Sequence, residues 1–278
     1  MEYCPADVLP QGGRSPRAEV DPRGPGGRRP CCTAVVTHLI DLAELGSVGG
    51  FFALREGPGG PGSVPFADVY APPPAARDPL GFRVGKVERG LRAPEVRVAA
   101  SVAQLGLAAR LWSVALGSAA LYGAVPDLDA ALLRWDPDGA SPDDLWLTDV
   151  RPLPGDARTV RRVVADGHLE PLAAALRARY RISAGLLRGN AGSALAGAAR
   201  ELHAWAVREG REDVGERGLA MAAELFGHPG LRGTGTLDGA AFRRRSCCLY
   251  YRCPNGGVCG DCCFERPPSR SSHRASSG

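Results

Sequence analysis

Six of the nine cysteines in this 278-residue sequence lie close together near its C-terminal end. Four of them have the spacing CC-x10-C-x2-C, and these are Cys247, Cys248, Cys259 and Cys262. The run Pro-Asn-Gly-Gly at 254–257 favours a turn between the two pairs, which brings the Cys-x-x-Cys against the adjacent pair. A [2Fe–2S] cluster takes two thiolates on each iron. The spacing therefore predicts one [2Fe–2S] cluster held by these four cysteines.

The order of the cysteines suggests how the two irons are shared. We assign the adjacent pair to one iron and the two cysteines of the Cys-x-x-Cys to the other. Cys253 and Cys263 lie in the same segment, and either has the chemistry to replace one of the four. We interpret both as spare thiols.

Other uses of these thiols are weighed against the cluster. A structural zinc site usually has two Cys-x-x-Cys-type knuckles, and adjacent cysteines fit one tetrahedral ion less readily. A disulfide-rich tail and unmetallated reactive thiols are further alternatives. The first 30 residues have no apolar core of a secretory signal, so we expect a cytoplasmic protein, in which thiols stay reduced. Near the N-terminus, Cys4, Cys31 and Cys32 lack a Cys-x-x-Cys partner and are a weak metal signal.

Positive charge is concentrated around the cysteines. Residues 241–278 carry seven arginines against two carboxylates, although the whole chain has a net charge of only +4. The first 240 residues have no basic stripe with interleaved aromatic residues, so nucleic-acid binding is not expected. Four arginines flank the cysteines closely, and we expect them to offset the negative charge of the site and to attract an anionic partner: Arg243, Arg244, Arg245 and Arg252.

The elements that must position the cysteines are mostly helical. Periodic apolar patterns and end signals predict helices at 33–45, 94–123, 157–166, 171–180, 183–209 and 212–226, with a short helix between 126 and 135. Strand-like composition appears at 50–55, 64–70 and 145–150. The longest apolar run, 111–125, is too short and too rich in glycine and serine for a membrane span. The expected fold class is mostly α, with a few short strands.

Composition divides the chain into four parts. Residues 1–30 are rich in proline, glycine and arginine and are expected to be a disordered tail. The helical domain extends over 31–240, and the iron–sulfur segment over 241–264. Residues 265–278 read as a second disordered tail. Residues 230–239 form a glycine-rich connector into the cysteine segment.

The cysteine segment FRRRSCCLYYRCPNGGVCGDC resembles the C-terminal signature of the FhuF-like ferric iron reductases, also called ferric siderophore reductases. LLRGNAGSALAGAAR at 186–200 and the helical stretch at 98–129 also resemble segments of that family, so the likeness covers about 33–264. Cys253 and Cys263 stand where the family pattern has no cysteine, and Arg188 stands where an aromatic residue is expected.

The resemblance implies a mostly helical fold related to the palm-like part of siderophore synthetases. It also implies that the cysteines of the CC-x10-C-x2-C pattern bind the cluster and that the protein reduces ferric siderophores by one electron. The sequence GPGGPG at 57–62 matches a nucleotide fingerprint, but its two prolines prevent the helix that the fingerprint needs. The electron is therefore expected from a ferredoxin or a separate reductase. An iron–sulfur sensor and a zinc-stabilised interaction module remain alternatives.

Overall fold

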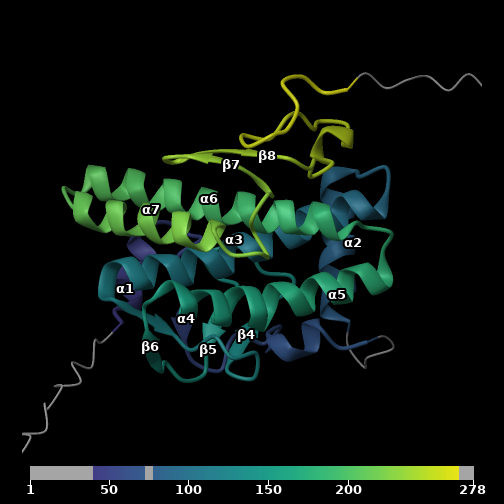
Figure 1. The fold of residues 1–278 in the computed structure, drawn as a ribbon. Helices are drawn as coiled ribbons and strands as arrows, with labels where there is room; N and C mark the ends of the chain where they lie inside the picture. Colours follow the sequence, from purple (N-terminus) through teal and green to yellow (C-terminus); the bar gives the residue numbers. More distant parts are fainter. Residues whose placement is uncertain (1–39, 73–77, 269–278) are drawn as a thin grey trace, which may run out of the picture. The chain divides into compact units, whose positions relative to one another are not determined.

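The computed structural model describes residues 40–72 and 78–268 (Figure 1). The described residues do not include the predicted tail at 1–30 or the N-terminal cysteines Cys4, Cys31 and Cys32. They also leave out the first part of the predicted helix at 33–45 and the last part of the C-terminal tail. The described chain is mostly helical with a few short strands, as the sequence predicts.

The centre of the fold is α3 (Val96–Tyr122), a helix rich in alanine that is buried on nearly all sides. It ends at Gly123, whose positive φ of 65° is the left-handed conformation that terminates helices. By length and composition α3 could cross a membrane, but 78% of its most apolar window is buried inside the protein. It is therefore the core helix around which the other elements pack.

Two long helices lie against α3 and form an antiparallel pair: α6 (Ala184–Arg208) and α7 (Glu212–Phe226). Ser183 caps α6 by accepting a hydrogen bond from the N–H of Leu186 at 3.1 Å. The turn between the two helices uses Gly210 at φ 65°. Both helices and their boundaries agree with the sequence prediction to within a residue or two.

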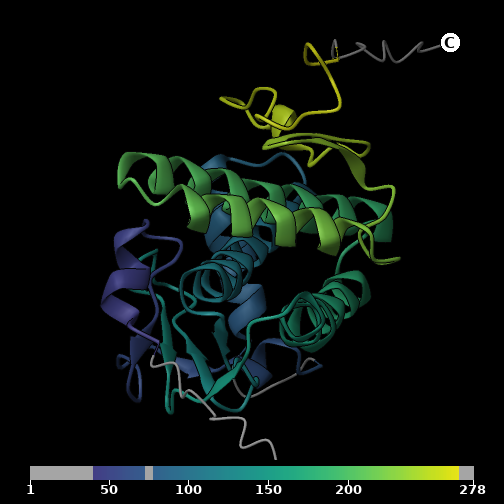
Figure 2. The ribbon, with the colours of Figure 1, turned by 60° about the vertical axis from the view of Figure 1, so that its left-hand side comes forward.

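Most of the remaining helical elements pack around the other sides of α3 (Figure 2), whereas the last one, at 250–252, lies in the cysteine segment. A continuous helical stretch contains α4 (Ala157–Arg161), the π-helical turn η2 (Arg162–Leu169) and α5 (Glu170–Arg179). The sequence predicts two helices separated near Pro171, but proline is tolerated in the first turn of α5, so the chain continues without a break. The other helices are α1 (Leu42–Ser47), η1 (Phe66–Val69), α2 (Pro79–Leu91) and η3 (Tyr250–Arg252).

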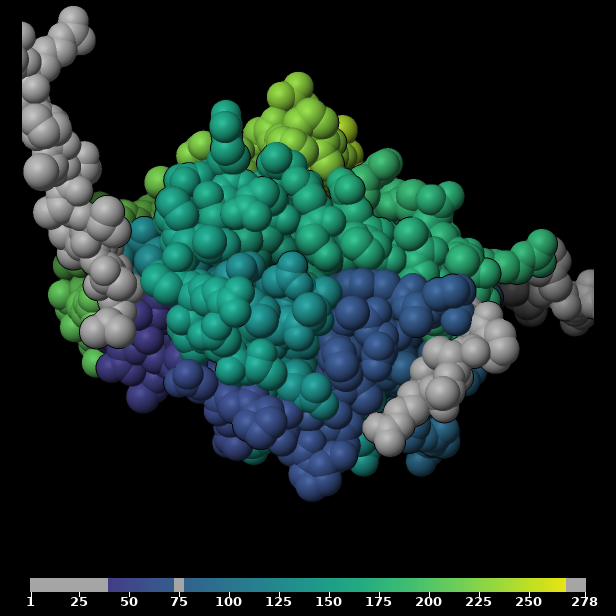
Figure 3. Space-filling view, turned by 90° about the horizontal axis from the view of Figure 1, so that it is seen from below, coloured from purple at the N-terminus to yellow at the C-terminus, as the bar shows by residue number. Residues whose placement is uncertain are grey.

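The strands are two to four residues long. A four-stranded sheet has the order β1-β5-β4-β2, with β1 parallel to β5 and the other pairs antiparallel. Two further antiparallel pairs are β3 with β6 and the hairpin of β7 with β8. Figure 3 views the molecule from the side of β4, β5, α4 and α5, where the segments coloured blue and teal form the surface. The strand bounds are Arg55–Glu56, Val64–Pro65, Ala124–Pro126, Leu133–Trp135, Leu145–Leu147, Pro152–Pro154, Gly235–Asp238 and Ala241–Arg244.

Several local predictions are wrong. The short helix expected between 126 and 135 is replaced by β3 and β4, because the carboxylates of Asp127 and Asp129 accept backbone N–H bonds two residues on and form turns. Residues 50–54 are turn and irregular chain, and 66–69 form η1, so only the ends of those predicted strands are extended. The helix α2 was not predicted, although Asp78 caps it through the N–H of Gly81.

A buried ion pair links α3 to the sheet. The Arg110 guanidinium contacts the Asp144 carboxylate at 2.9 Å, and the two side chains are 3% and 5% exposed. Arg110 also donates to the backbone carbonyls of Gly50 and Ala53, at 3.0 and 2.7 Å. Because Asp144 directly precedes β5, this network fixes the sheet and the loop before β1 against the central helix.

Candidate metal centre

The cysteine segment is attached to α6 by the hairpin of β7 and β8 (Figure 1). Phe242 of β8 stacks on Phe226 of α7 with 5.0 Å between ring centroids. Two glycines of α6 permit the close approach. A Cβ at Gly189 would lie 2.0 Å from Ser246 Oγ, and one at Gly192 would lie 2.7 Å from Thr234 Oγ1.

A chain of buried polar groups joins the cysteine segment to both long helices. Ser101 of α3 donates from its hydroxyl to the carbonyl of Cys248 at 2.8 Å. Asn190 of α6 donates to the carbonyl and hydroxyl oxygens of Ser101, at 3.0 and 3.1 Å. The amide oxygen of Asn190 in turn accepts from the guanidinium of Arg244. All these side chains are at most 1% exposed, so the backbone beside the cysteines is held by the protein core.

Asp261, which lies between the two cysteines of the Cys-x-x-Cys, is a second anchor. Its carbonyl accepts the backbone N–H of Arg244 at 3.0 Å, which ties the two ends of the segment together. Its carboxylate accepts from Ser193 Oγ at 2.5 Å and from Arg200 Nη1 at 3.3 Å, both on α6. The loop of the Cys-x-x-Cys is therefore fixed to α6, and the N–H of Cys262 closes it through the carbonyl of Cys259 at 3.0 Å.

The structure brings five of the six thiols into two groups. The sulfur atoms of Cys247, Cys262 and Cys263 all lie within 4.8 Å of one another. The sulfur atoms of Cys248 and Cys259 are 3.7 Å apart. One thiol of the adjacent pair lies in each group, and Cys247 and Cys248 are also joined by a hydrogen bond, so the sharing of the irons that the order of the cysteines suggests remains a prediction. The four predicted ligands converge, and Cys263 lies with them.

Cys253 belongs to neither group of thiols. It is 3% exposed, and burial raises the pKa of its thiol. Its backbone N–H donates to the carbonyl of Tyr250 at 3.0 Å and its carbonyl accepts from Gly256 at 3.0 Å. Its position fits the interpretation of a spare thiol that packs beneath the turn at 254–257.

Hydrogen bonds already set the acidity of the thiols. The pKa of Cys247 is lowered, first by a hydrogen bond from the Cys248 thiol and also by the N–H of Leu249, which lies 3.2 Å from its sulfur. The same bond raises the pKa of Cys248, which donates it. The pKa of Cys259 is raised, first by its hydrogen bond to Cys248. The N–H of Phe264 lies 3.4 Å from the sulfur of Cys262. Backbone N–H groups that point at sulfur also support a metal-bound thiolate.

The buried charge of Arg244 fits an anionic group at this site. The side chain is 1% exposed, and among the described residues its Nε and Nη1 atoms have no hydrogen-bond partner. No carboxylate of the described chain forms an ion pair with it, whereas its charge acts to lower the pKa values of Cys248, Cys259 and Cys263. A buried cation is costly without a counter-charge. Thiolates that hold a [2Fe–2S] cluster supply that negative charge, so the donor set and its surroundings fit the cluster.

The other flanking arginines have different surroundings. Arg243 and Arg245 are exposed, and Arg243 has one loose ion pair, with Glu265 at 3.8 Å. Arg252 pairs with Glu95, which precedes α3, and contacts the ring of Tyr251. The four arginines therefore do not share one role. Arg244 is buried near the thiols, Arg252 ties the segment to the residue before α3, and Arg243 and Arg245 face solvent.

Sequence reasoning did not identify the residues that hold the segment. Ser101, Asn190 and Ser193 are buried and bond to it, Ser193 through the buried carboxylate of Asp261. A signal was present, since Asn190 is the one amide side chain in α6. A buried amide requires hydrogen-bond partners, and a search for those partners would have led to this site.

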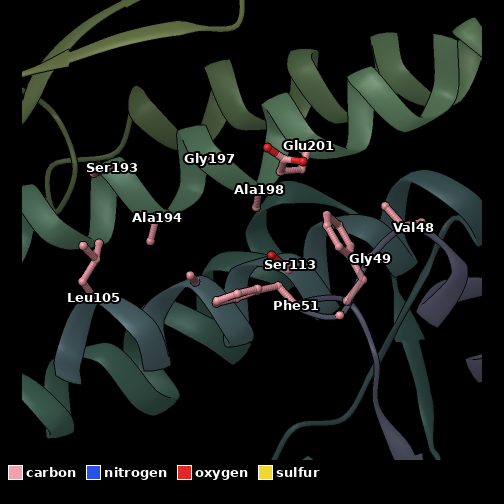
Figure 4. A pocket seen from close by; sticks show the side chains of 13 residues that line it. Val48, Gly49, Phe51, Leu105, Ser113, Ser193, Ala194, Gly197, Ala198 and Glu201 are labelled. Atoms are coloured by element: carbon pink, nitrogen blue, oxygen red, sulfur yellow. The ribbon is translucent and has the colours of Figure 1, made fainter. Parts of the chain in front are cut away.

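A separate pocket of about 380 Å³ lies between α3, α6 and the loop after α1 (Figure 4). Phe51, Leu105 and Ala194 contribute to its mainly apolar wall. Glu201 is the ionisable side chain among the residues that line it. Ser193 also lines the pocket and donates to Asp261, so one hydrogen bond separates the pocket from the cysteine segment.

Comparison with known proteins places the site in a family. The family model described as the FhuF 2Fe-2S C-terminal domain matches residues 244–264, a stretch that begins at the buried Arg244 and includes all five converging thiols. Comparison with curated proteins finds no match to this chain. The match agrees with the resemblance of the cysteine segment and with the geometry of its thiols. The chain therefore carries a FhuF 2Fe-2S C-terminal domain at residues 244–264, and its converging cysteines fit a [2Fe–2S] cluster.

Proposed function

We propose that this protein is a cytoplasmic one-electron reductase that releases iron from ferric siderophores. The observation that supports it most is the coincidence of the FhuF domain match with a set of converging thiols on a segment at the protein surface. Cys247, Cys259 and Cys262 are only half-buried. The [2Fe–2S] cluster, when bound, supplies single electrons.

The surface around the thiols suits an anionic partner. Arg243 and Arg245 are exposed, and Arg243 donates to the carbonyl of Cys263. Hydroxamate and catecholate siderophores present hard anionic oxygens that bind Fe(III) far more tightly than Fe(II). A bulky complex can approach an exposed segment without entering a cavity. When the Fe(III) of the complex gains one electron it becomes Fe(II), and its hold on the siderophore weakens.

The proposed electron transfer requires no general acid or base from the protein. His168 and His203 lie among core and helix residues and not beside the thiols, so no acid or base is assigned to them. In the described chain, the stretch at 57–62 connects two short strands and is not followed by a helix of a nucleotide fold. We infer that a ferredoxin or a separate reductase supplies the electron, and that its docking also uses the surface of the cysteine segment.

A single-turnover experiment tests the proposal. The protein is purified without oxygen, reduced, freed of reductant and mixed with a ferric hydroxamate siderophore while its visible spectrum is followed. We expect the cluster to be reoxidised as a ferrous chelator traps about one Fe(II) per cluster, because one electron moves in each turnover. Cys248→Ala, expected to lack the cluster, is the control and should release no iron.

Other results would contradict the proposal in specific ways. A reduced protein whose spectrum does not change when ferric siderophore is added would favour the sensor alternative. A colourless protein that contains zinc would favour the interaction module. Reoxidation without release of Fe(II) would show that the siderophore is not the electron acceptor.

A further inference from the structure

The two groups of thiols differ in size. One consists of Cys248 and Cys259, with sulfurs 3.7 Å apart. The other consists of Cys247, Cys262 and Cys263, with all three sulfurs within 4.8 Å of one another. A [2Fe–2S] cluster requires four thiolates, two for each iron. The segment therefore presents five converging thiols for four ligand positions, and the extra thiol lies in the group of Cys247, Cys262 and Cys263.

We propose that Cys263 is an alternative ligand for the iron that Cys247 and Cys262 bind. The inference rests on the cluster-binding part of the proposed function and is independent of whether the protein reduces siderophores. Cys248 and Cys259 bind the other iron and have no such substitute. Each iron is thus held by one cysteine from the adjacent pair and one from the C-terminal cysteines.

The local structure makes the exchange a small movement. Cys262 and Cys263 are consecutive, and both sulfurs are already close to that of Cys247. The carbonyl of Cys263 accepts a hydrogen bond from Arg243 Nη2 at 3.4 Å, so its backbone is positioned by β8. Asp261, the residue that directly precedes Cys262, is itself bound to α6. Either sulfur can therefore reach the iron without a change in the anchored part of the segment.

The exchange involves a proton and no electron. A cysteine binds iron as a thiolate, so Cys263 releases its proton to solvent when its sulfur replaces that of Cys262. The displaced Cys262 sulfur takes up a proton in the same way. Cluster charge and oxidation state are unchanged, and the four-thiolate count is maintained. The consequence is a site that tolerates loss or oxidation of Cys262.

Alanine substitutions test the proposal, because alanine cannot ligate iron whereas serine offers an oxygen. Cys262→Ala should keep at least about half of the wild-type iron and sulfide, with a perturbed visible spectrum, since Cys263 completes the four ligands. Cys263→Ala should keep the wild-type content and spectrum. The double variant Cys262→Ala with Cys263→Ala should fall to about a tenth of the wild-type content, as should Cys259→Ala. Cys253→Ala, at a thiol outside both groups, is the matched control and should remain loaded.

A second measurement reports directly on the Cys263 sulfur. The loaded proteins are treated with a thiol-alkylating reagent, and labelled positions are found by mass spectrometry. We expect Cys263 to be labelled in the wild type and protected in Cys262→Ala, whereas the Cys253 signal should be the same in both. Far-UV circular dichroism establishes that each variant retains the helical fold.

Three outcomes would overturn the proposal. Cys262→Ala could lose its iron as fully as Cys259→Ala does. Cys263 could be labelled equally fast in the wild type and in Cys262→Ala. Cys263→Ala alone could lose the cluster, which would make Cys263 an obligatory ligand and not an alternative one. Failure of siderophore reduction in a protein that keeps its cluster would contradict only the proposed function.

Discussion

Asn190 accepts a hydrogen bond from Arg244 across 54 positions of sequence, and this bond lies at the junction of the core and the cysteine segment. On its other side, Asn190 donates to Ser101 of α3. The guanidinium is thereby held beside the thiols, with two of its nitrogens unpartnered among the described residues. Asn190 is therefore a positioning residue for a buried positive charge.

We predict that Arg244→Met lowers the reduction potential of the cluster. Reduction adds a negative charge, and a nearby buried cation stabilises the reduced form more than the oxidised form. A loss of about 1.4 kcal/mol of that preference corresponds to a shift on the order of 60 mV for one electron. The potential is measured by titration followed by electron paramagnetic resonance.

Two variants make the interpretation specific. Arg244→Lys keeps the charge and should shift the potential less than Arg244→Met. Asn190→Ala keeps the charge of Arg244 but removes the hydrogen bond that positions it. The reduction potential should therefore fall, but by less than in Arg244→Met. Equal potentials in all the variants would show that Arg244 acts on packing and not on the charge of the cluster.

The exposed arginines give a prediction on association rate. Arg243→Gln with Arg245→Gln should slow electron transfer to an anionic ferric siderophore and flatten the fall in rate with salt, because screening acts over about 8 Å at physiological ionic strength. Arg244 is left intact because it is buried. Stopped-flow rates over a series of salt concentrations provide the measurement.

The control for steering removes the same amount of charge elsewhere. Arg177→Gln with Arg208→Gln neutralises two exposed arginines. Arg208 lies about 27 Å along α6 from Asn190, from the rise of an α-helix. These changes should leave the salt dependence close to that of the wild type. If the two double variants have the same salt dependence, net charge and not the site accounts for the effect.

His168 makes the fold sensitive to mild acid. It is buried, with Nδ1 2.6 Å from the Tyr70 hydroxyl and Nε2 bonded to the carbonyl of Leu128, so Nε2 carries the proton and Nδ1 accepts from Tyr70. Burial lowers its pKa to about 4, against 6.5 for the unfolded chain. The unfolded state therefore binds the proton first, and stability is complete above pH 6.5 and falls as pH drops toward 4.

The full effect amounts to about 3 kcal/mol in the free energy of unfolding. His168→Gln can keep both hydrogen bonds without titrating, so we expect it to lose this part of the pH dependence. Urea unfolding at pH 7.5 and pH 5 measures the difference between the two proteins, in which contributions common to both cancel. Parallel pH dependences in wild type and variant would contradict the assignment.

The buried pair of Arg110 and Asp144 should contribute far more than an exposed pair. Asp144→Ala leaves a buried guanidinium without its counter-charge and should cost about 3–5 kcal/mol of stability. The double variant Arg110→Met with Asp144→Leu removes both charges and should regain much of the stability that Asp144→Ala loses. At the exposed pair of Arg151 with Asp149, Asp149→Ala should cost less than about 1 kcal/mol. Similar losses at the two sites, measured by urea unfolding, would show that burial is not decisive.

The long helices could be predicted because their signals are local. Ser183 caps α6, Gly123 ends α3, and both helices have enough length for an apolar pattern to be read. The convergence of the four predicted ligands also follows from spacing and from the turn at 254–257. By contrast, a strand of two or three residues is too short to show an alternating apolar pattern, so strands such as β3, β4 and β6 could not be predicted from the sequence. The helix α2 could not be placed reliably from its pattern either.

The details of the site depend on contacts distant in sequence. Three consecutive arginines at 243–245 look alike, and only the position of Asn190 shows that Arg244 is buried. The grouping of the thiols depends on the backbone after the adjacent pair, where Leu249 has a positive φ of 69°. A leucine in that conformation is uncommon, and nothing in the local sequence predicts it. The order of the cysteines alone therefore does not determine which thiols share an iron.

The glycines of α6 bear on the order in which a new chain matures. Gly189 and Gly192 let the cysteine segment lie directly on the helix surface, so that surface must exist before the thiols can take their places. Ribosomal synthesis delivers α3, α6 and α7 before any of the converging cysteines emerges, and domains form in that direction. The elements that carry the contact surface for the cysteine segment are thus all synthesised before the thiols that must lie on it.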